Sequence, residues 1–143
     1  MSFDVQILNG DLNLDSLGQL ALVRNIDKVA QDVLRVIMTT RGSDPFDTSY
    51  GISTTNRAIG SMPTTSIISA TLEAEISNSL QKLIREQNRL STVQTLTADE
   101  RIREIDSVVV EQDPIEPRQL TVSISMTLET LEPITIQTTL QSV

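Results

Sequence analysis

The 143-residue sequence contains no cysteine, no histidine and no tryptophan, and its aromatic side chains are Phe3, Phe46 and Tyr50 alone. Without cysteine, neither a disulfide framework nor a thiolate metal site can form, as is typical of a protein made in the cytoplasm. Without cysteine and histidine, the usual nucleophile–base pairs of hydrolytic enzymes are absent. We therefore expect no metal and no cofactor.

Positive charge and glycine clusters are also scarce. The chain carries 11 Lys and Arg residues against 19 Asp and Glu residues, which gives a net charge of −8. Nucleic-acid binding needs a basic surface that displaces counterions from phosphates, so this charge argues against a nucleic-acid partner. The five glycines are isolated from one another, which excludes a glycine-rich phosphate-binding loop.

Long hydrophobic runs are missing as well. No segment approaches the ~20 apolar residues that span a bilayer, and the first residues lack the basic stretch of a signal peptide. We therefore expect no membrane contact and a soluble protein made in the cytoplasm. The length favours a single domain over residues 1–143. Hydrophobic residues make up 38% of the chain and are almost all aliphatic, so the core should consist of Leu, Ile and Val.

The most informative stretch, residues 25–51, predicts a helix followed by a tight elbow. Asn25 is expected to cap the helix, and Asp27 places a favourable negative charge in its first turn. The apolar residues follow the i, i+3, i+4, i+7 spacing of a helix with one buried face. They are Ile26, Val29, Ala30, Val33, Leu34, Ile37 and Met38.

The elbow, residues 40–51, combines helix-ending residues with two aromatics. Gly42 is suited to the left-handed position just after a helix, and Pro45 prevents the helix from resuming. Phe46 and Tyr50 both lie in this short segment. Their concentration predicts that the elbow packs against the rest of the protein.

A second long helix is predicted after Pro63 by a further apolar stripe. A capping box, Thr97 with Glu100 three residues later, then predicts a short helical turn. The stripe consists of Ile68, Leu72, Ile76, Leu80, Leu83, Ile84 and Leu90.

The remaining segments have the alternation of strands. Residues 3–7 predict a short strand, Asn9-Gly10 predicts a tight turn, and residues 11–23 predict a small hairpin. Near the C-terminus, residues 105–110 predict a central strand, and residues 120–128 and 134–140 alternate strictly. We therefore expect an α+β fold in which two helices cover one face of a C-terminal three-stranded antiparallel meander.

Catalytic chemistry has weak support. A glycosidase needs two carboxylates roughly 5–9.5 Å apart, for which Asp44 with Asp47 is one candidate pair and Glu73 with Glu75 another. Such a cleft usually offers apolar and aromatic walls to its ligand, and three aromatics provide a poor one. We expect these carboxylates to be helix caps and surface charges, and we predict no catalytic residue.

The N-terminal order of elements resembles a known family. The order begins with a hairpin that contains Gly10-Asp11-Leu12-Asn13-Leu14, followed by a helix and then by a Thr-Arg-Gly-Ser elbow with Pro45 and Tyr50-Gly51. This order resembles that of the baseplate wedge and sheath-initiator proteins of contractile-tailed phages and related injection systems. The resemblance covers roughly residues 8–140, and the block from Gly10 to Gly51 is its most specific part.

That family carries a Glu-Pro-Arg motif just before the first strand of its C-terminal sheet. The matching place here has Asp99 for the glutamate and Arg101 for the arginine, and the proline is missing. This departure puts in doubt the contact that the family motif makes; a surface ion pair of Arg101 with Asp99 or Glu104 is the competing interpretation. A literal Glu-Pro-Arg at residues 116–118 lies between two predicted strands, where we interpret it as a turn.

The resemblance implies structural work in the baseplate of the virion tail, assembled in the host cytoplasm. Family members occur in six copies, join the wedge to the hub and tube, and template the first sheath ring by exchanging β-strands with sheath subunits. The last predicted strand could offer an edge for strand addition unless residues 3–7 or a helix cover it. The implied partner-binding residues are Gly42, Pro45, Tyr50, Gly51, Asp99, Arg101, Ile134, Ile136, Thr138 and Leu140.

Two other functions remain open. Members of this family have carried a lysozyme label, so a peptidoglycan hydrolase that uses Asp44, Asp47 or Glu73 is one alternative. A small adaptor unrelated to contractile tails is the other.

Overall fold

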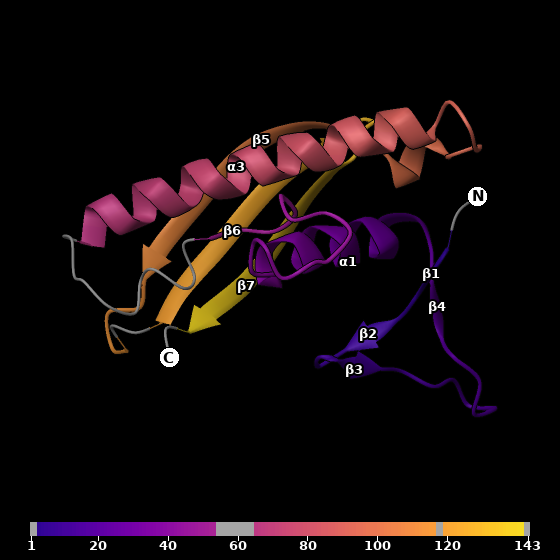
Figure 1. The fold of residues 1–143 in the computed structure, drawn as a ribbon, viewed down its shortest axis with the longest axis horizontal. Helices are drawn as coiled ribbons and strands as arrows, with labels where there is room; N and C mark the ends of the chain where they lie inside the picture. The colour runs from indigo at the N-terminus through magenta and orange to yellow at the C-terminus, as the bar shows by residue number, and fades with distance from the viewer. Residues whose placement is uncertain (1–2, 54–64, 117–118, 142–143) are drawn as a thin grey trace.

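A computed structural model describes residues 3–53, 65–116 and 119–141. Figure 1 shows a mixed α+β fold, which confirms the predicted class, with an N-terminal antiparallel hairpin, two helices and a C-terminal antiparallel sheet. The elements are β1 (Asp4–Val5), β2 (Ile7–Leu8), β3 (Asp11–Leu12), β4 (Leu22–Val23), α1 (Asn25–Met38), α3 (Thr65–Leu90), the 3-10 helix η1 (Ala98–Glu100), β5 (Ile102–Gln112), β6 (Gln119–Leu128) and β7 (Pro133–Gln141).

The C-terminal sheet has the strand order β5-β6-β7, and both pairings are antiparallel. Ile124 on β6 lies opposite Val108 on β5 and Ile136 on β7. The prediction that residues 105–110 form the central strand is therefore wrong, because β6 occupies the centre and β5 an edge. The β-branched run suggested burial on both sides, but Val109 points to the outer face of the sheet and is 41% exposed.

Helix α3 lies along one face of this sheet, and α1 packs beside it (Figure 1). From Val122 to Leu128, alternate residues of β6 point toward the helices and are fully buried, whereas the residues between them are half-buried hydroxyl side chains. Each buried aliphatic side chain contributes about 1.5–3 kcal/mol, so this layer holds the fold together. The core includes Val29, Val33, Ile37, Ile52, Leu72, Ile76, Leu80, Val122, Ile124, Met126 and Leu128.

The helix boundaries differ slightly from the predicted ones. Helix α1 begins at Asn25, and the N-cap is Arg24, which makes no side-chain capping hydrogen bond. The prediction of Asn25 as the cap is wrong, because Asn25 takes a φ of +55°, a left-handed conformation that asparagine tolerates better than most residues. The helix ends at a C-cap, Thr39, so Gly42 is left-handed within the elbow rather than directly after the helix.

The N-terminal residues 3–23, which we call the arm, form two antiparallel ladders. Strand β1 pairs with β4, and β2 pairs with β3 across the predicted Asn9-Gly10 turn. Both turn residues have positive φ, as favoured two-residue hairpin turns require. A further antiparallel bridge between Leu14 and Leu20 closes the second hairpin, as the sequence predicted.

The predicted capping box at η1 is also present. The carboxylate of Glu100 accepts hydrogen bonds from the backbone N–H of Thr97 at 2.8 Å and from its hydroxyl at 2.9 Å. Across the described ranges, no helix combines the length and the apolar character needed to cross a membrane.

Candidate partner-binding site

The outer edge of β7 is one candidate surface. Strand β7 pairs with β6 on one side, and no other strand of the described residues pairs with its opposite side. Residues 3–7, which could have covered this edge, instead belong to strands that pair within the arm. An unpaired strand edge presents a row of backbone donors and acceptors to any further strand.

The register identifies the backbone groups that face outward. The N–H of Val110 on β5 donates to the carboxylate of Glu73 on α3 at 3.0 Å, so the polar backbone groups of Val110 point away from β6. Its partner Val122 therefore directs its own groups toward β7, where it pairs with Thr138. Because these directions alternate along a strand, the N–H and C=O groups at the outer edge of β7 come from the residues between the core-facing ones. These are Thr135, Gln137 and Thr139.

The four β7 residues named from the sequence occupy the other register. Ile136 and Leu140 are buried in the core, and Ile134 packs against it. Thr138 is half-buried and pairs with Val122. These side chains hold β7 in place, whereas the outward backbone groups come from their neighbours.

The elbow is closed tightly at its base. The backbone N–H of Arg41 donates to the carbonyl of Ile52, and the N–H of Ile52 donates to the carbonyl of Thr39, both at 3.0 Å. Gly51 has a φ of +90°, and a Cβ atom there would lie 2.2 Å from the backbone oxygen of Thr39. Glycine is therefore required at position 51 by both conformation and space.

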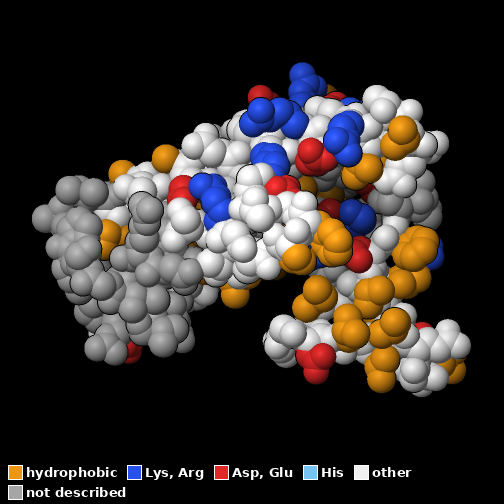
Figure 2. Space-filling model, in the orientation of Figure 1, with side chains coloured by type: hydrophobic (Ala, Val, Ile, Leu, Met, Phe, Trp, Pro, Cys, Tyr) orange, Lys and Arg blue, Asp and Glu red, His pale blue; other side chains and the backbone are white. Residues whose placement is uncertain are grey.

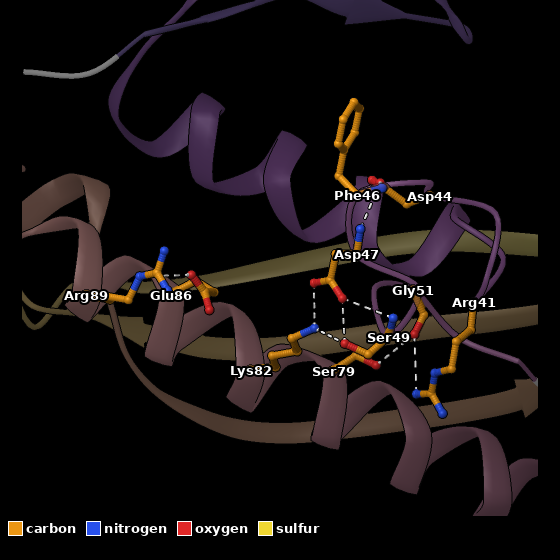
Figure 3. Close-up of polar contacts among 10 residues, drawn as sticks. All are labelled: Arg41, Asp44, Phe46, Asp47, Ser49, Gly51, Ser79, Lys82, Glu86 and Arg89. Atoms are coloured by element: carbon orange, nitrogen blue, oxygen red, sulfur yellow. Dashed lines mark hydrogen bonds and ion pairs between the residues drawn. The ribbon is translucent and has the colours of Figure 1, made fainter.

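Polar contacts hold the elbow against α3 (Figure 3). The ammonium group of Lys82 forms an ion pair with Asp47 at 2.6 Å and also contacts Ser49. The carbonyl of Gly51 accepts from the Ser79 hydroxyl at 3.2 Å and from the Arg41 guanidinium at 3.3 Å. Hydrogen bonds from Lys82 and then from Ser49 lower the pKa of Asp47 to about 2.

The tip of the elbow is not packed as its aromatic content predicted. Phe46 is 98% exposed, and its ring points away from the contacts with α3 (Figure 3). The Asp44 carboxylate accepts hydrogen bonds from the backbone N–H groups of Phe46 and Asp47, and this local turn holds the tip in place. Of the two aromatic residues in the elbow, Tyr50 is the half-buried one, and this burial raises the pKa of its phenol. Gly42 and Pro45 are exposed beside the tip.

The residues that match the family motif lie in η1 and directly after it, and Arg101 contacts the last turn of α3. The Asp99 carboxylate contacts the Thr97 hydroxyl, and the Arg101 guanidinium donates to the side chain of Asn88 at 2.9 Å. The salt bridges found among the described residues do not include one from Arg101 to Asp99 or Glu104. The Nε atom of Arg101 is buried without a hydrogen-bond partner in the described structure.

The literal Glu-Pro-Arg sequence falls in the connection between β5 and β6. The Asp113 carboxylate accepts hydrogen bonds from the backbone N–H groups of Ile115 and Glu116, which lower its pKa. Residues 113–116 therefore form a turn at the start of this connection. Pro117 and Arg118 lie outside the described residues.

The three candidate carboxylates for hydrolysis are engaged elsewhere. Asp44 holds the turn at the elbow tip, Asp47 is paired with Lys82, and Glu73 accepts from Val110. A glycosidase general acid requires a raised pKa, whereas the pKa of Asp47 is lowered. The cavity beside Asp47 measures about 90 Å³, well below the 300–1,000 Å³ of usual ligand pockets.

A larger cleft of about 440 Å³ lies between the arm, α1 and the end of α3, and none of those three carboxylates lines it. Three of its acidic residues form ion pairs: Asp32 with Lys28 at 2.6 Å, Asp4 with Arg35 at 2.9 Å and Glu86 with Arg89 at 3.7 Å. Within the described part of the chain, no group of three or more acidic side chains is arranged to hold a metal ion.

Comparison with solved structures finds the same fold in a protein from Geobacter sulfurreducens named "putative tail lysozyme". The TM-score is 0.62 with 16% sequence identity, and the alignment covers 82% of this chain and 90% of the other. At this identity, the likeness shows a shared fold. No known family model matches the sequence, and no curated protein matches it.

Proposed function

We propose that this protein is a structural component of a contractile-tail baseplate that joins wedge and hub and templates the first sheath ring. In this proposal a sheath subunit contributes a β-strand to the outer edge of β7. The outer edge of β7, with which no strand of the described residues pairs, carries the proposal, because the residues PITIQTTLQ contain no charge that would repel a partner strand.

The fold supports the location in a tail. The chain shares its architecture with a protein whose name contains the words "tail lysozyme", over most of both chains. The Gly10–Gly51 block, which carries the family resemblance, folds into the arm, α1 and the closed elbow. We propose six copies per baseplate, assembled in the host cytoplasm, with the elbow and the Asp99–Arg101 region facing wedge or hub proteins.

We also propose that the protein is not an enzyme. The lysozyme alternative gains no support from Asp44, Asp47 or Glu73, since each is bound within turn, ion-pair or strand-edge contacts. In this proposal the protein acts through its binding surfaces, so it requires no metal or organic cofactor.

The test uses a backbone change at the β7 edge. Gln137→Pro removes one outward N–H group and leaves the core side chains and the backbone hydrogen bonds between β6 and β7 in place. It also removes the hydrogen bond that the Gln137 side chain donates to the Ser123 hydroxyl at 3.3 Å, and the control below loses the same bond. Gln137→Thr is the matched control, because it keeps the N–H group and a β-forming side chain. Each full-length variant is copurified with sheath and wedge proteins encoded beside it.

We expect the wild type and Gln137→Thr to retain both sheath and wedge proteins, and Gln137→Pro to retain the wedge proteins alone. Retention of the sheath protein by Gln137→Pro would contradict strand addition at this edge. If the wild type retained neither class, the unrelated-adaptor alternative would replace the tail assignment, and clearing of a peptidoglycan suspension would instead favour the hydrolase.

A further inference from the structure

The turn between β2 and β3 contains the dipeptide Asn9-Gly10. Asn9 is the only asparagine of the chain that is followed by glycine, and both residues are exposed on the arm, which extends below α1 (Figure 2). The backbone nitrogen that follows an asparagine can attack the side-chain carbonyl carbon, and glycine hinders this attack least because it has no Cβ atom. No described atom beyond the two neighbouring residues lies within 4 Å of the place that a Cβ atom of Gly10 would take. The sequence and the surroundings therefore leave this attack unhindered.

The other asparagines that the structure describes are protected. Asn13 is half-buried, its side chain donates a hydrogen bond within the arm at 2.7 Å, and leucine follows it. Asn78 and Asn88 lie inside α3, where the next backbone N–H groups belong to the hydrogen-bonded helix. Asn25 is followed by a β-branched isoleucine, whose Cβ atom crowds the attacking nitrogen. Asn9 therefore differs from each of them in sequence and in structure.

The hairpin that holds this turn can open at low cost. Asn9 and Gly10 have φ values of +54° and +84°, the left-handed conformations of a two-residue hairpin turn. The turn has to open before the Gly10 nitrogen can rotate toward the Asn9 side chain. Strands β2 and β3 pair over two residues each, and all of these residues are exposed. A two-stranded ladder of this kind is marginally stable, so local opening frees the turn without unfolding the core.

We propose that Asn9 is a site of deamidation, with Gly10 as the attacking residue and water as the co-reactant. The Gly10 nitrogen loses its proton to solvent base and bonds to Cγ of Asn9. The Cγ–Nδ2 bond breaks, and Nδ2 takes a proton from water and departs as ammonia, which leaves a succinimide ring. A water molecule then opens the ring: its oxygen bonds to one of the two ring carbonyl carbons, the bond from that carbon to the Gly10 nitrogen breaks, and the nitrogen regains a proton. This reaction does not depend on the tail assignment.

The two possible products affect the hairpin differently. Ring opening at Cγ gives aspartate, which adds a negative charge and keeps the main chain intact. Ring opening at the backbone carbonyl carbon gives isoaspartate, whose main chain runs through Cβ and Cγ and is longer by an atom. The favoured two-residue turns do not fit this longer chain, so we expect the pairing of β2 with β3 to be lost. The base of the arm should stay in place, because the Gln31 side chain binds the backbone of Val5 and of Ile7, both at 2.9 Å.

The test ages the full-length protein in heavy-oxygen water at neutral and at mildly alkaline pH. Peptide mass spectrometry measures the conversion of each asparagine and the uptake of heavy oxygen, and electron-transfer fragmentation distinguishes isoaspartate from aspartate. Gly10→Ala places a Cβ atom on the attacking residue. Gly18→Ala is the matched control, because Gly18 also has a positive φ, +73°, and open space around its Cβ position, but does not follow an asparagine. Both substitutions bring the same kind of backbone strain.

We expect Asn9 to deamidate at least about tenfold faster than any other described asparagine, in the wild type and in Gly18→Ala alike. In Gly10→Ala the rate at Asn9 should fall at least about tenfold. The rate should rise with pH, because the Gly10 nitrogen attacks after it loses its proton. Equal rates at all described asparagines would overturn the site. An unchanged rate in Gly10→Ala, or a product without heavy oxygen, would overturn the proposed reaction.

A second measurement tests the consequence for the arm. Asn9→Asp carries the new charge on a normal main chain, so we expect it to keep the cross-strand NMR contact between Ile7 and Leu12. The aged fraction that contains isoaspartate should lose this contact. Thermal melting should be unchanged in both, because the turn lies outside the core. Retention of the contact in the isoaspartate fraction would overturn the proposed loss of pairing.

Discussion

The two outer edges of the C-terminal sheet differ in how they are protected against pairing with a further strand. The β5 edge has register irregularities between Ile102 and Glu104 and between Ile105 and Ser107, and Glu73 of α3 accepts the outward N–H of Val110. The β7 edge pairs with β6 in continuous register and contains no charged residue. Bulges, charges and covering elements are the usual means by which proteins block edge-to-edge pairing.

Among the residues that the structure describes, edge protection in this sheet is therefore local and falls on β5. Helix α3 packs much more extensively on β5 than on β7, so it can cover one edge without reaching the other. The continuous β7 register leaves three consecutive outward positions, Thr135, Gln137 and Thr139, in line for a further strand. Single substitutions on either edge test whether the two edges differ in this way.

The largest effect on stability should come from a proline substitution at position 138 of β7, compared with the same substitution at position 137. Thr138→Pro removes an N–H group that faces Val122, and we expect it to lower the free energy of unfolding by roughly 3 kcal/mol. Gln137→Pro removes an outward N–H group, and we expect a loss below about 1 kcal/mol. Urea unfolding followed by circular dichroism measures both. Equal losses would show that the assigned directions of the β7 backbone groups are wrong.

The next effect concerns the covered edge. Glu73→Ala leaves the N–H of Val110 without its acceptor, and we expect a loss of about 1–2 kcal/mol in unfolding free energy. Glu73→Gln keeps an acceptor oxygen and should recover most of the loss. We also expect faster amide exchange at Val110 in Glu73→Ala, measured by NMR. Unchanged exchange would argue that the bulges alone protect β5.

A smaller effect on stability should follow from placing a charged residue on β7, since β5 carries Arg103, Glu104, Asp106 and Glu111 and β7 carries none. We expect Gln137→Lys to change the free energy of unfolding by less than about 0.5 kcal/mol, because position 137 is exposed. Sheath-protein binding in the copurification should fall, because an edge lysine opposes strand addition. If Gln137→Lys bound the sheath protein as well as the wild type does and melted at the same temperature, the sheath protein would not bind at this edge.

The fold was largely predictable because long periodic segments carry strong signals. The alternation from Leu120 to Leu128 predicted β6, and the stripe from Ile68 to Ile84 predicted most of α3. Strand order was not predictable in the same way. Val108–Val110 is β-branched whether β5 lies at the centre or at an edge, and the outcome depends on the path of β6 and β7.

The candidate site was less predictable, for physical reasons. Alternation shows which face a side chain takes, but the direction of a backbone N–H depends on which side the neighbouring strand lies. The sequence therefore named Ile136 and Thr138, whereas the outward groups belong to their neighbours, such as Gln137. The contact between Glu73 and Val110 joins distant segments, and no local pattern indicates it. Phe46 is exposed because a turn centred on Asp44 fixes the tip away from the core.

The smallest effect on stability concerns Asp47. Its ion pair with Lys82 of α3 lies at the surface of the elbow, whereas the contact of Glu73 lies at a strand edge. The pKa of Asp47 is lowered from 3.8 to about 2, so its pairing with Lys82 stabilises the folded state above pH ~4 and is lost as the pH falls from 3.8 through about 2. Because the side chain of Asp47 is 46% exposed, solvent screens this contribution. In Lys82→Met, the pKa of Asp47 should rise toward 3.8, as measured by NMR titration of its carboxyl carbon. Asp113 is an internal control, since backbone N–H groups lower its pKa. A rise at Asp113 as well would indicate a general loss of structure, and no change at Asp47 would assign its lowered pKa to Ser49 alone.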